Sequence, residues 1–382
     1  MQKKLIALAL ASAFAAPAFA ATSNVDIYGV MNVSVDRIDS GVTGKDKSTG
    51  LTSNASRIGF KGTEDLGGGL AAVWQIENTV AVDGAGLGGL RNTFVGLKGG
   101  FGTVLLGNID TPMKGLGRAV DNFGDGLADS RNILGASAGT GASTWDLRTK
   151  NTIAYVTPDF SGLSAVVAYV TDWTGATTTT SPCVGPVAGV QAGLDCNKFS
   201  AWSGAVNYNN GPLLLGAGYE KHNAMTTAAA DYSAHIWRVV AGYSFAGAKL
   251  GALYEKASGD TGVAAANINA ADRKAWGLFA NYAIGAVTLK ANYLKADEQG
   301  SGAAATNTGA KQYTLGADYA LSKRSTAYVY YAKVKNDGNT TGGAGYGLGA
   351  GAGDSNSVVA GSAAANLGTD PSVFGVGMKH TF

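Results

Sequence analysis

The feature that most constrains the fold is an alternation of apolar and polar residues, repeated in segments of about ten residues along most of the chain. In the segment from Val25 to Ile38, the odd positions Val25, Ile27, Met31, Val33 and Val35 are apolar. The even positions Asp26, Tyr28, Asn32, Ser34 and Asp36 are mostly polar. A period of two places the two sets on opposite faces of a β-strand. Counting such segments to the C-terminal Phe382 predicts sixteen strands.

The connections between these segments alternate between short and long. Turn-forming residues such as Asn209–Pro212 and Gly285–Ala286 make the short ones, whereas the long ones include 39–53, 173–198 and 336–371. This is the plan of an outer-membrane barrel, with short periplasmic turns and long external loops. Hydrocarbon cannot pair an open sheet edge, so such a sheet must close. The sequence therefore predicts an all-β, 16-stranded antiparallel transmembrane barrel, wide enough to hold an aqueous channel.

The N-terminus predicts export from the cytoplasm. Lys3 and Lys4 precede an apolar run from Leu5 to Ala16, and Ala18-Phe19-Ala20 supplies a small-x-small cleavage pattern. We expect residues 1–20 to be a signal peptide and residues 21–382 to form one barrel domain. Without Lys3 and Lys4 the 29 basic residues fall to 27, equal to the 27 acidic ones. A neutral chain gives no reason to expect a nucleic-acid partner.

The two cysteines, Cys183 and Cys196, fall in one long connection of an exported chain. Because the periplasm is oxidising, we expect a disulfide between them. The loop contains no histidine, so a metal site lacks ligands there. His222, His235 and His380 lie on different expected strands and none joins a nucleophile. We therefore expect neither an enzyme nor a cofactor or metal.

Several stretches, in order along the chain, resemble the general diffusion porins of beta-proteobacteria. They are Asn24–Val30, Ser56–Gly67, Phe94–Gly102, Tyr155–Gly162 and the terminal Val376–Phe382. The resemblance covers the chain after the signal peptide from end to end. It implies a homotrimer in the outer membrane that lets ions and small hydrophilic solutes diffuse passively. It also implies that the terminal Phe382 is recognised by the machinery that inserts barrels into this membrane.

The resemblance further implies where the channel narrows. The third external loop, about 111–147, would fold into the lumen and face a basic barrel wall. Lys61 lies two side-chain steps from Arg57 on one strand face, so it should share the lumen. Crowded guanidiniums remain charged and rings of them favour anions, so a mild anion preference follows. The expected wall residues are Arg57, Lys61, Arg91 and Arg148, and the expected loop residues are Arg118, Asp121, Asp125, Asp129 and Arg131.

Other functions remain open at this point. A porin specific for a small organic acid would share this plan. A sugar porin would place a run of aromatic residues along the constriction, and the third loop offers only Phe123 and Trp145. An adhesin or structural barrel would work through its external loops, which here are rich in Gly, Ala, Ser and Thr. A barrel enzyme would need a nucleophile beside a base, and no convincing Ser/His pair is present.

Overall fold

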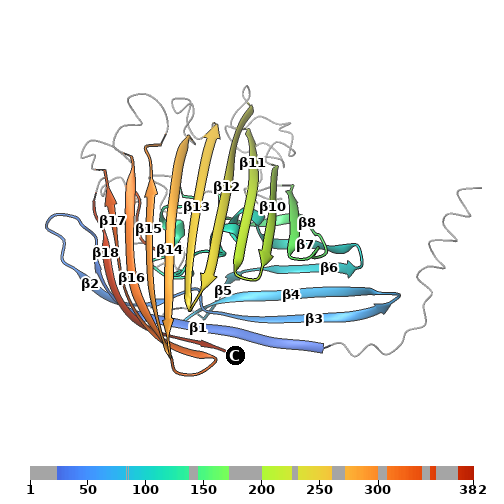
Figure 1. Cartoon of the computed structure of the whole chain (residues 1–382), viewed down its shortest axis with the longest axis horizontal. Coiled ribbons are helices and arrows are strands. Elements are labelled where there is room, and N and C mark those ends of the chain that lie inside the picture. The colour runs from blue at the N-terminus through green and yellow to red at the C-terminus, as the bar shows by residue number, and fades with distance from the viewer. Residues whose placement is uncertain are drawn as a thin grey trace, which may run out of the picture.

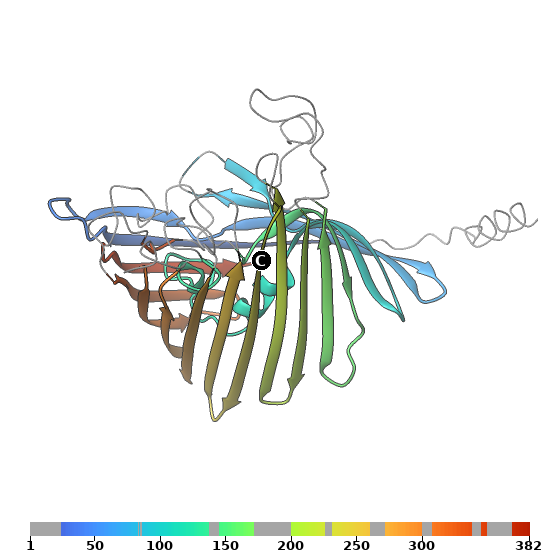
Figure 2. The ribbon, with the colours of Figure 1, turned by 90° about the horizontal axis from the view of Figure 1, so that it is seen from above.

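The computed structural model describes residues 24–82, 84, 86–136, 145–171, 200–225, 231–259, 272–299, 308–337, 345–349 and 369–382. These residues form a single antiparallel sheet that closes on itself (Figures 1 and 2). The expected signal peptide, residues 1–20, and both cysteines lie outside the described residues. Among the described residues, neither helical segment has the length and apolarity needed to span a bilayer.

The sheet comprises eighteen strand segments, and two short helical segments interrupt it. The strands are β1 (Asn24–Asp39), β2 (Ser48–Ser53), β3 (Arg57–Gly67), β4 (Leu70–Ala81), β5 (Gly86–Leu90), β6 (Thr93–Gly99), β7 (Gly102–Asp110), β8 (Arg148–Val156), β9 (Leu163–Val170), β10 (Ala201–Asn210), β11 (Leu213–Met225), β12 (Asp231–Phe245), β13 (Ala248–Gly259), β14 (Arg273–Ile284), β15 (Val287–Ala296), β16 (Ala310–Ala320), β17 (Ser325–Asn336) and β18 (Ser372–Thr381). The helical segments are α2 (Pro112–Arg118) and the 3₁₀ turn η1 (Ser130–Asn132).

These eighteen segments occupy sixteen positions around the barrel. β2 and β3 both pair with β1, β2 through Val33↔Ser53 and β3 through Val30↔Arg57, so they form one interrupted strand. β5 and β6 likewise both pair with β4. β18 pairs with β1 from Val30↔Thr381 to Asp39↔Ser372 and closes the ring. The sixteen-stranded closed barrel expected from the sequence is confirmed.

The connections sort by length onto the two ends of the barrel. β10–β11, β12–β13 and β14–β15 are joined by two residues each, whereas residues 111–147 separate β7 from β8. Two-residue connections hold neighbouring strands in a tight hairpin. In bacterial outer-membrane barrels, the short connections face the periplasm and the long ones face outward.

The two faces of each strand differ as the alternation predicted. On β1, Val35 is 53% exposed on the outer face, whereas the adjacent Asp36 is fully buried in the interior. Large apolar residues such as Ile27, Leu106, Val239 and Leu315 are exposed around the barrel. Exposed apolar residues outside and buried polar residues inside are what a strand between lipid and a polar lumen requires.

The third external loop enters the lumen and packs against one side of the wall. In Figure 2, α2 lies within the ring of strands. Thr111 caps α2 by accepting the Lys114 amide, and Pro112 begins the helix. Leu116 fits over Gly216 and Gly218 of β11, where a side chain on either glycine would lie 2.6 Å from a Leu116 methyl carbon. The glycines thus let the loop approach the wall closely.

Candidate pore constriction

The part of the wall that faces the loop is irregular at four places, between β2 and β3, between β5 and β6, on β7 and on β8. Ala55, between β2 and β3, has φ 52°, and Asn151 on β8 has φ 53°. β5 and β6 separate at 91–92, and the β7–β8 register shifts between Gly107 and Ile109. Such interruptions re-aim side chains and release backbone groups from the ladder. Arg57, Arg91 and Arg148 lie beside these breaks.

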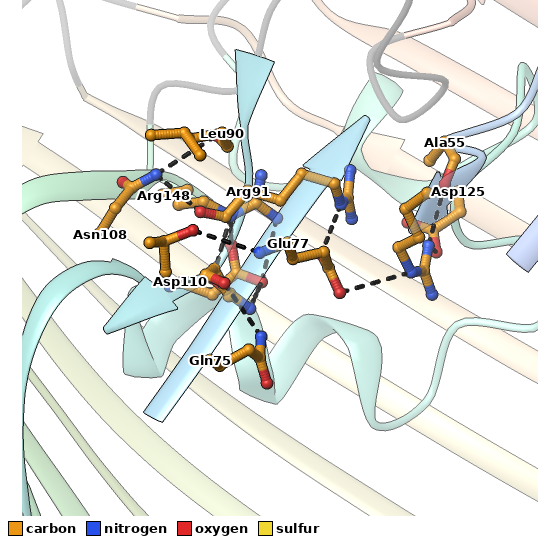
Figure 3. Close-up of polar contacts among 12 residues, drawn as sticks. Ala55, Gln75, Glu77, Leu90, Arg91, Asn108, Asp110, Asp125 and Arg148 are labelled. Atoms are coloured by element: carbon orange, nitrogen blue, oxygen red, sulfur yellow. Dashed lines mark hydrogen bonds and ion pairs between the residues drawn. The ribbon is translucent and has the colours of Figure 1, made fainter. Parts of the chain in front are cut away.

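Arg91 is held by Glu77 of β4. Its Nε donates to Glu77 Oε1 at 2.6 Å, and its backbone amide donates to the Glu77 carbonyl at 2.7 Å (Figure 3). Tyr28 Oη donates to the other Glu77 oxygen at 2.9 Å. Arg91 is only 8% exposed, so it contributes its charge to the lumen more than a contact surface for solutes.

Arg148 and Lys114 converge on Asp110, the last residue of β7. Arg148 Nε lies 3.0 Å from Asp110 Oδ1, and Lys114 Nζ lies 2.7 Å from the same oxygen. Asn92, released from the ladder by the β5–β6 break, accepts from Arg148 Nε at 3.0 Å and from the Asp110 amide at 3.0 Å. Lys114 therefore connects helix α2 to the arginine side of the wall.

Arg57 contacts the loop directly. Its Nη1 donates to Asp125 Oδ2 at 3.1 Å and to the carbonyl of Ala55 at 3.0 Å. Figure 3 shows Asp125 beside Ala55, set apart from the cluster around Arg91 and Glu77. The sequence grouped Arg57 with the wall and Asp125 with the loop, and the structure brings these two residues together.

The other two expected loop acids bond mainly within the loop, although Asp121 also accepts from Asn292 Nδ2 of β15 at 2.9 Å. Asp129 caps η1 and takes a bidentate pair of bonds from Arg131, through Nε at 3.0 Å and Nη2 at 2.8 Å. Asp121 accepts from the amides of Phe123 and Ser130, both at 3.0 Å. In the described part of the chain, neither carboxylate forms an ion pair or hydrogen bond with Arg57, Arg91 or Arg148. Of the three acids, Asp125 is the one that meets the arginine wall.

The loop's own cations lie beside these acids. Arg118 Nη2 lies 2.5 Å from Asp125 Oδ1, and Arg131 Nη2 lies 3.9 Å from the same oxygen. Burial opposes ionisation of Asp125, but Arg118 and Arg57 outweigh it and hold the pKa of its carboxyl well below the usual range. Asp125 therefore stays charged at physiological pH.

Two loop groups titrate nearer to neutrality. Burial, reinforced by the Asp129 carboxylate, raises the pKa of Asp121 to about 6. Burial lowers the pKa of Lys114 to about 8, although the Asp110 carboxylate favours its charged form. The charge of the constriction consequently depends on pH on both sides of pH 7.

Two further lysines project into the lumen without an ion pair among the described residues. Lys61 shares a strand face with Arg57 and lies over the Tyr28 ring at 5.4 Å. Asp26 is opposite Lys61 in the β1–β3 register, yet no ion pair within 4.0 Å joins them. Lys379 of β18 lines a cavity of about 280 Å³ between the loop and the β15–β18 wall. Lys290, Lys323 and Arg324 line the same cavity, with Asp318 as its one acid.

Sequence reasoning missed the cluster that anchors the loop. Arg238 of β12 is fully buried and donates from Nη1 to the Met113 carbonyl at 2.8 Å and to Asp146 Oδ1 at 2.7 Å. Glu255 of β13 accepts from Arg238 Nη2 at 2.6 Å and also pairs with Arg273. The two-residue turn between β12 and β13 fixes the register that places Arg238 opposite Glu255. Counting outward from that turn would have found the pair.

The C-terminal residue completes the seam of the barrel. The amide of Gly29 donates to the Phe382 carbonyl at 3.0 Å, and the Phe382 amide donates back to Gly29 at 3.1 Å. The Phe382 ring covers Gly29, where any side chain would clash with it. Phe382 thus joins the last strand to the first; its recognition during insertion stays a prediction.

Comparisons with known proteins agree with this geometry. A model of the Gram-negative porin family matches residues 7–339. Outer membrane porin protein 32 of Delftia acidovorans is 32% identical over 391 aligned residues, covering 100% of both chains. The chain spans about half the length of major outer membrane protein P.IB of Neisseria gonorrhoeae, with 38% identity over 176 residues, which are 44% of this chain and 48% of that one.

Solved structures show the same fold. An anion-selective porin from Comamonas acidovorans superposes with a TM-score of 0.72 at 24% identity, covering 94% of this chain and 100% of that chain. The trimer form of OmpT from Vibrio cholerae gives a TM-score of 0.61 at 16% identity, covering 94% of this chain and 99% of that chain. Family match, full-length relative and closed barrel together show that the chain belongs to the Gram-negative porins of the outer membrane.

Proposed function

We propose that this porin conducts ions and small hydrophilic solutes with a mild preference for anions. The observation that carries the proposal is the composition of the ion-pair network at the constriction. It joins six basic side chains to four acidic ones: Arg57, Arg91, Lys114, Arg118, Arg131 and Arg148 with Glu77, Asp110, Asp125 and Asp129. Asp121 adds one nearby acid, and Lys61 and Lys379 add two unpaired cations.

The selectivity follows from charge and needs no chemical step. A guanidinium keeps its proton even among like charges, which makes arginine suitable for a crowded cationic wall. A wall with more cations than acids stabilises an anion in transit. Asp125 opposes Arg57 from the loop side and limits this preference. The similarity to an anion-selective porin supports the same direction.

The test is the reversal potential of the reconstituted channel under a KCl gradient. We expect current through the refolded full-length protein and a potential of the sign that indicates chloride preference. A potassium preference would refute the anion selectivity, but the proposal that the protein forms a channel would stand. A folded barrel without conductance would refute the channel itself.

A second candidate, a channel with a binding site for a small organic acid, is supported by the cavity beside the loop. Lys379 offers a cation there, beside Lys290, which pairs with Asp318 at 2.9 Å. Asn54 Oδ1 is buried without a hydrogen-bond partner in the described part of the chain. A solute with a carboxylate and a hydroxyl could pair with a lysine and donate to Asn54. Citrate should then reduce the chloride current in a saturable manner, and Lys379→Gln should abolish the saturation. A linear response to citrate would exclude the site.

We further propose that three copies assemble through the outward faces of β1–β9 and β18. Exposed apolar residues cover these strands, among them Ile27, Ile76, Leu106 and Ile153. The similarity to a porin with a trimer form supports the number. Native mass spectrometry of the detergent-solubilised protein should give three chains. A monomeric mass, together with current steps that correspond to one channel at a time, would exclude this assembly.

A further inference from the structure

An aromatic and a basic residue occupy consecutive outward positions on seven successive strands. From β11 to β17 the pairs are Tyr219 with Lys221, Trp237 with His235, Tyr254 with Lys256, Trp276 with Lys274, Tyr293 with Lys295, Tyr313 with Lys311, and Tyr331 with Lys333. Their orientation is fixed by their neighbours, since Lys256, for example, lies between the buried Glu255 and Ala257. We name the basic members together with Lys335 the outer lysine belt.

The basic residue is always the one nearer the external loops. Alternate strands run in opposite directions, and the order within each pair reverses with them: the aromatic residue comes first on β11, β13, β15 and β17, and the basic residue comes first on β12, β14 and β16. A pattern that reverses with strand direction belongs to a level of the barrel and not to a repeated sequence motif.

The strand register aligns the pairs into two adjacent bands. Lys256 is directly opposite Lys274, and Lys311 is opposite both Lys295 and Lys335. Below them, ring centroids are 5.2 Å apart for Trp237–Tyr254, 5.3 Å for Trp276–Tyr293 and 5.2 Å for Tyr293–Tyr313. An outward aromatic band marks the boundary of the hydrocarbon. The lysines above it therefore stand at the headgroups of the external leaflet.

Lysines opposite each other repel, and the described residues only partly compensate them. Lys295 pairs with Asp297 at 3.0 Å. Asp272, Glu298 and Asp337 lie around the same surface hollow, of about 520 Å³, as Lys256, Lys274 and Lys295. Lys221, Lys311 and Lys335 have no ion pair within the described ranges. Among the described residues, seven lysines thus face four acids, which leaves the belt positive.

We propose that the outer lysine belt binds the phosphate groups of phosphorylated lipid in the external leaflet. The lysine stems lie along the barrel and their ammonium groups reach the phosphates, while the aromatic band packs against the lipid at the edge of its acyl region. Phosphate supplies the charge that the rows of opposed lysines lack. The belt ends on both sides. On β10 the position two residues to the external side of Trp202 is Ser200, and on β18 the position two residues to the external side of Phe374 is Ser372; neither is basic. The lipid contact therefore covers seven strands.

The test compares lipid retention by the full-length protein in nanodiscs. A bisphosphorylated glycolipid and its phosphate-free counterpart are supplied separately in phosphocholine, and retained glycolipid is quantified by mass spectrometry. The variant combines Lys274→Gln, Lys311→Gln and Lys335→Gln. A matched control combines Lys45→Gln, Lys98→Gln and Lys249→Gln, three exposed lysines outside the belt.

We expect the wild type and the control to retain the phosphorylated glycolipid, and the belt variant to retain about tenfold less. Added NaCl should weaken retention by the wild type, because the contact is ionic. Salt titration of the wild type gives an independent measurement should the triple variant fail to fold. Equal retention of the phosphate-free glycolipid by the wild type, or undiminished retention by a folded belt variant, would overturn the proposal.

Discussion

Arg238 holds Asp146, with 2.7 Å between Nη1 and Oδ1, and through this pair the wall grips the end of the loop that narrows the channel. The same nitrogen donates to the Met113 carbonyl at the start of the loop. One fully buried side chain on β12 therefore holds both ends of a segment that runs from 111 to 147. Because one side chain anchors both ends of the loop to the wall, we expect the constriction to be rigid.

Removing this anchor should loosen the loop. Arg238→Met leaves Asp146 and Glu255 as buried carboxylates without their main partner, which costs ~3–5 kcal/mol for a buried pair. We expect flickering single-channel currents and faster protease cleavage within the loop. Arg37→Met is the control and should change neither, because Arg37 is exposed and, among the described residues, its side chain bonds only to Thr49 Oγ1. Quiet currents from Arg238→Met would show that the loop is held by its apolar contacts.

Arg57 and Asp125 should shift ion selectivity in opposite directions. Arg57→Gln removes a cation from the wall, so the chloride-to-potassium permeability ratio should fall by about a factor of two. Asp125→Asn leaves three arginines without their shared carboxylate, so the ratio should rise by a similar factor. Reversal potentials at low and high KCl measure both, and the differences should shrink at high salt. Shifts of the same sign in both variants would contradict this assignment.

The selectivity should also depend on pH. Asp121, with a pKa of about 6, gains a proton as the pH falls through 6, so chloride preference should increase there. Lys114, with a pKa of about 8, loses its proton above that pH, so the preference should decrease. Asp121→Asn should remove the acidic step and Lys114→Met the alkaline one, as read from reversal potentials between pH 5 and pH 9. A profile that keeps both steps in both variants would rule these groups out.

The same raised pKa has a consequence for stability. Because the pKa of Asp121 in the folded protein lies above its ordinary 3.8, the native state holds a proton that the unfolded chain releases between these values. The contribution of this group to the free energy of unfolding is fully present below about pH 4 and is lost as the pH rises through 6. Asp121→Asn should therefore flatten the dependence of heat stability on pH in that window.

The backbone at Ala55 offers a test of the strand break. A left-handed conformation costs an L-residue ~1–2 kcal/mol, which glycine avoids. Ala55→Gly should leave the unfolding midpoint nearly unchanged, because the relieved strain offsets the greater freedom of the unfolded chain. Ala55→Val should lower it, because branched residues tolerate this region poorly. The control is Ala252, a regular outward position on β13, where substitution by glycine should lower the unfolding midpoint. Equal effects of glycine at Ala55 and Ala252 would contradict backbone strain at Ala55.

The fold could be predicted from the sequence because the residues of each strand alternate between the lipid and the lumen. Val35 and Asp36 are adjacent in the sequence, yet one is half exposed and the other fully buried. Two-residue turns fix the strand register. Counting residues outward from the turn at 246–247 would therefore have predicted that Arg238 pairs with Glu255. The interruptions of β2/β3 and β5/β6 were not readable, because Ala55 and Arg91 carry no signature of an irregular backbone.

The constriction was only partly predictable. Resemblance placed the loop at 111–147 and grouped Arg57, Arg91 and Arg148, which the structure places beside the strand breaks. It could not separate Asp125, which reaches Arg57, from Asp129, which bonds within the loop, and Asp121, which bonds within the loop and to Asn292 of β15. That difference depends on the path of an irregular segment, which no periodicity encodes. Lys114 was missed for the same reason. The disulfide between Cys183 and Cys196 stays a prediction, as does the signal peptide.

The strand breaks separate two parts of the barrel that can change independently. On the periplasmic side of the breaks, the tight connections at 68–69 and 100–101 fix the strand register and so the positions of Arg57 and Arg91. Above them, β2 and β5 continue toward the outside as separate segments. Insertions there would lengthen the outer segments without moving either arginine. Lineages carrying this architecture can therefore alter the surface they show to phage and antibodies while the permeability of the cell stays the same.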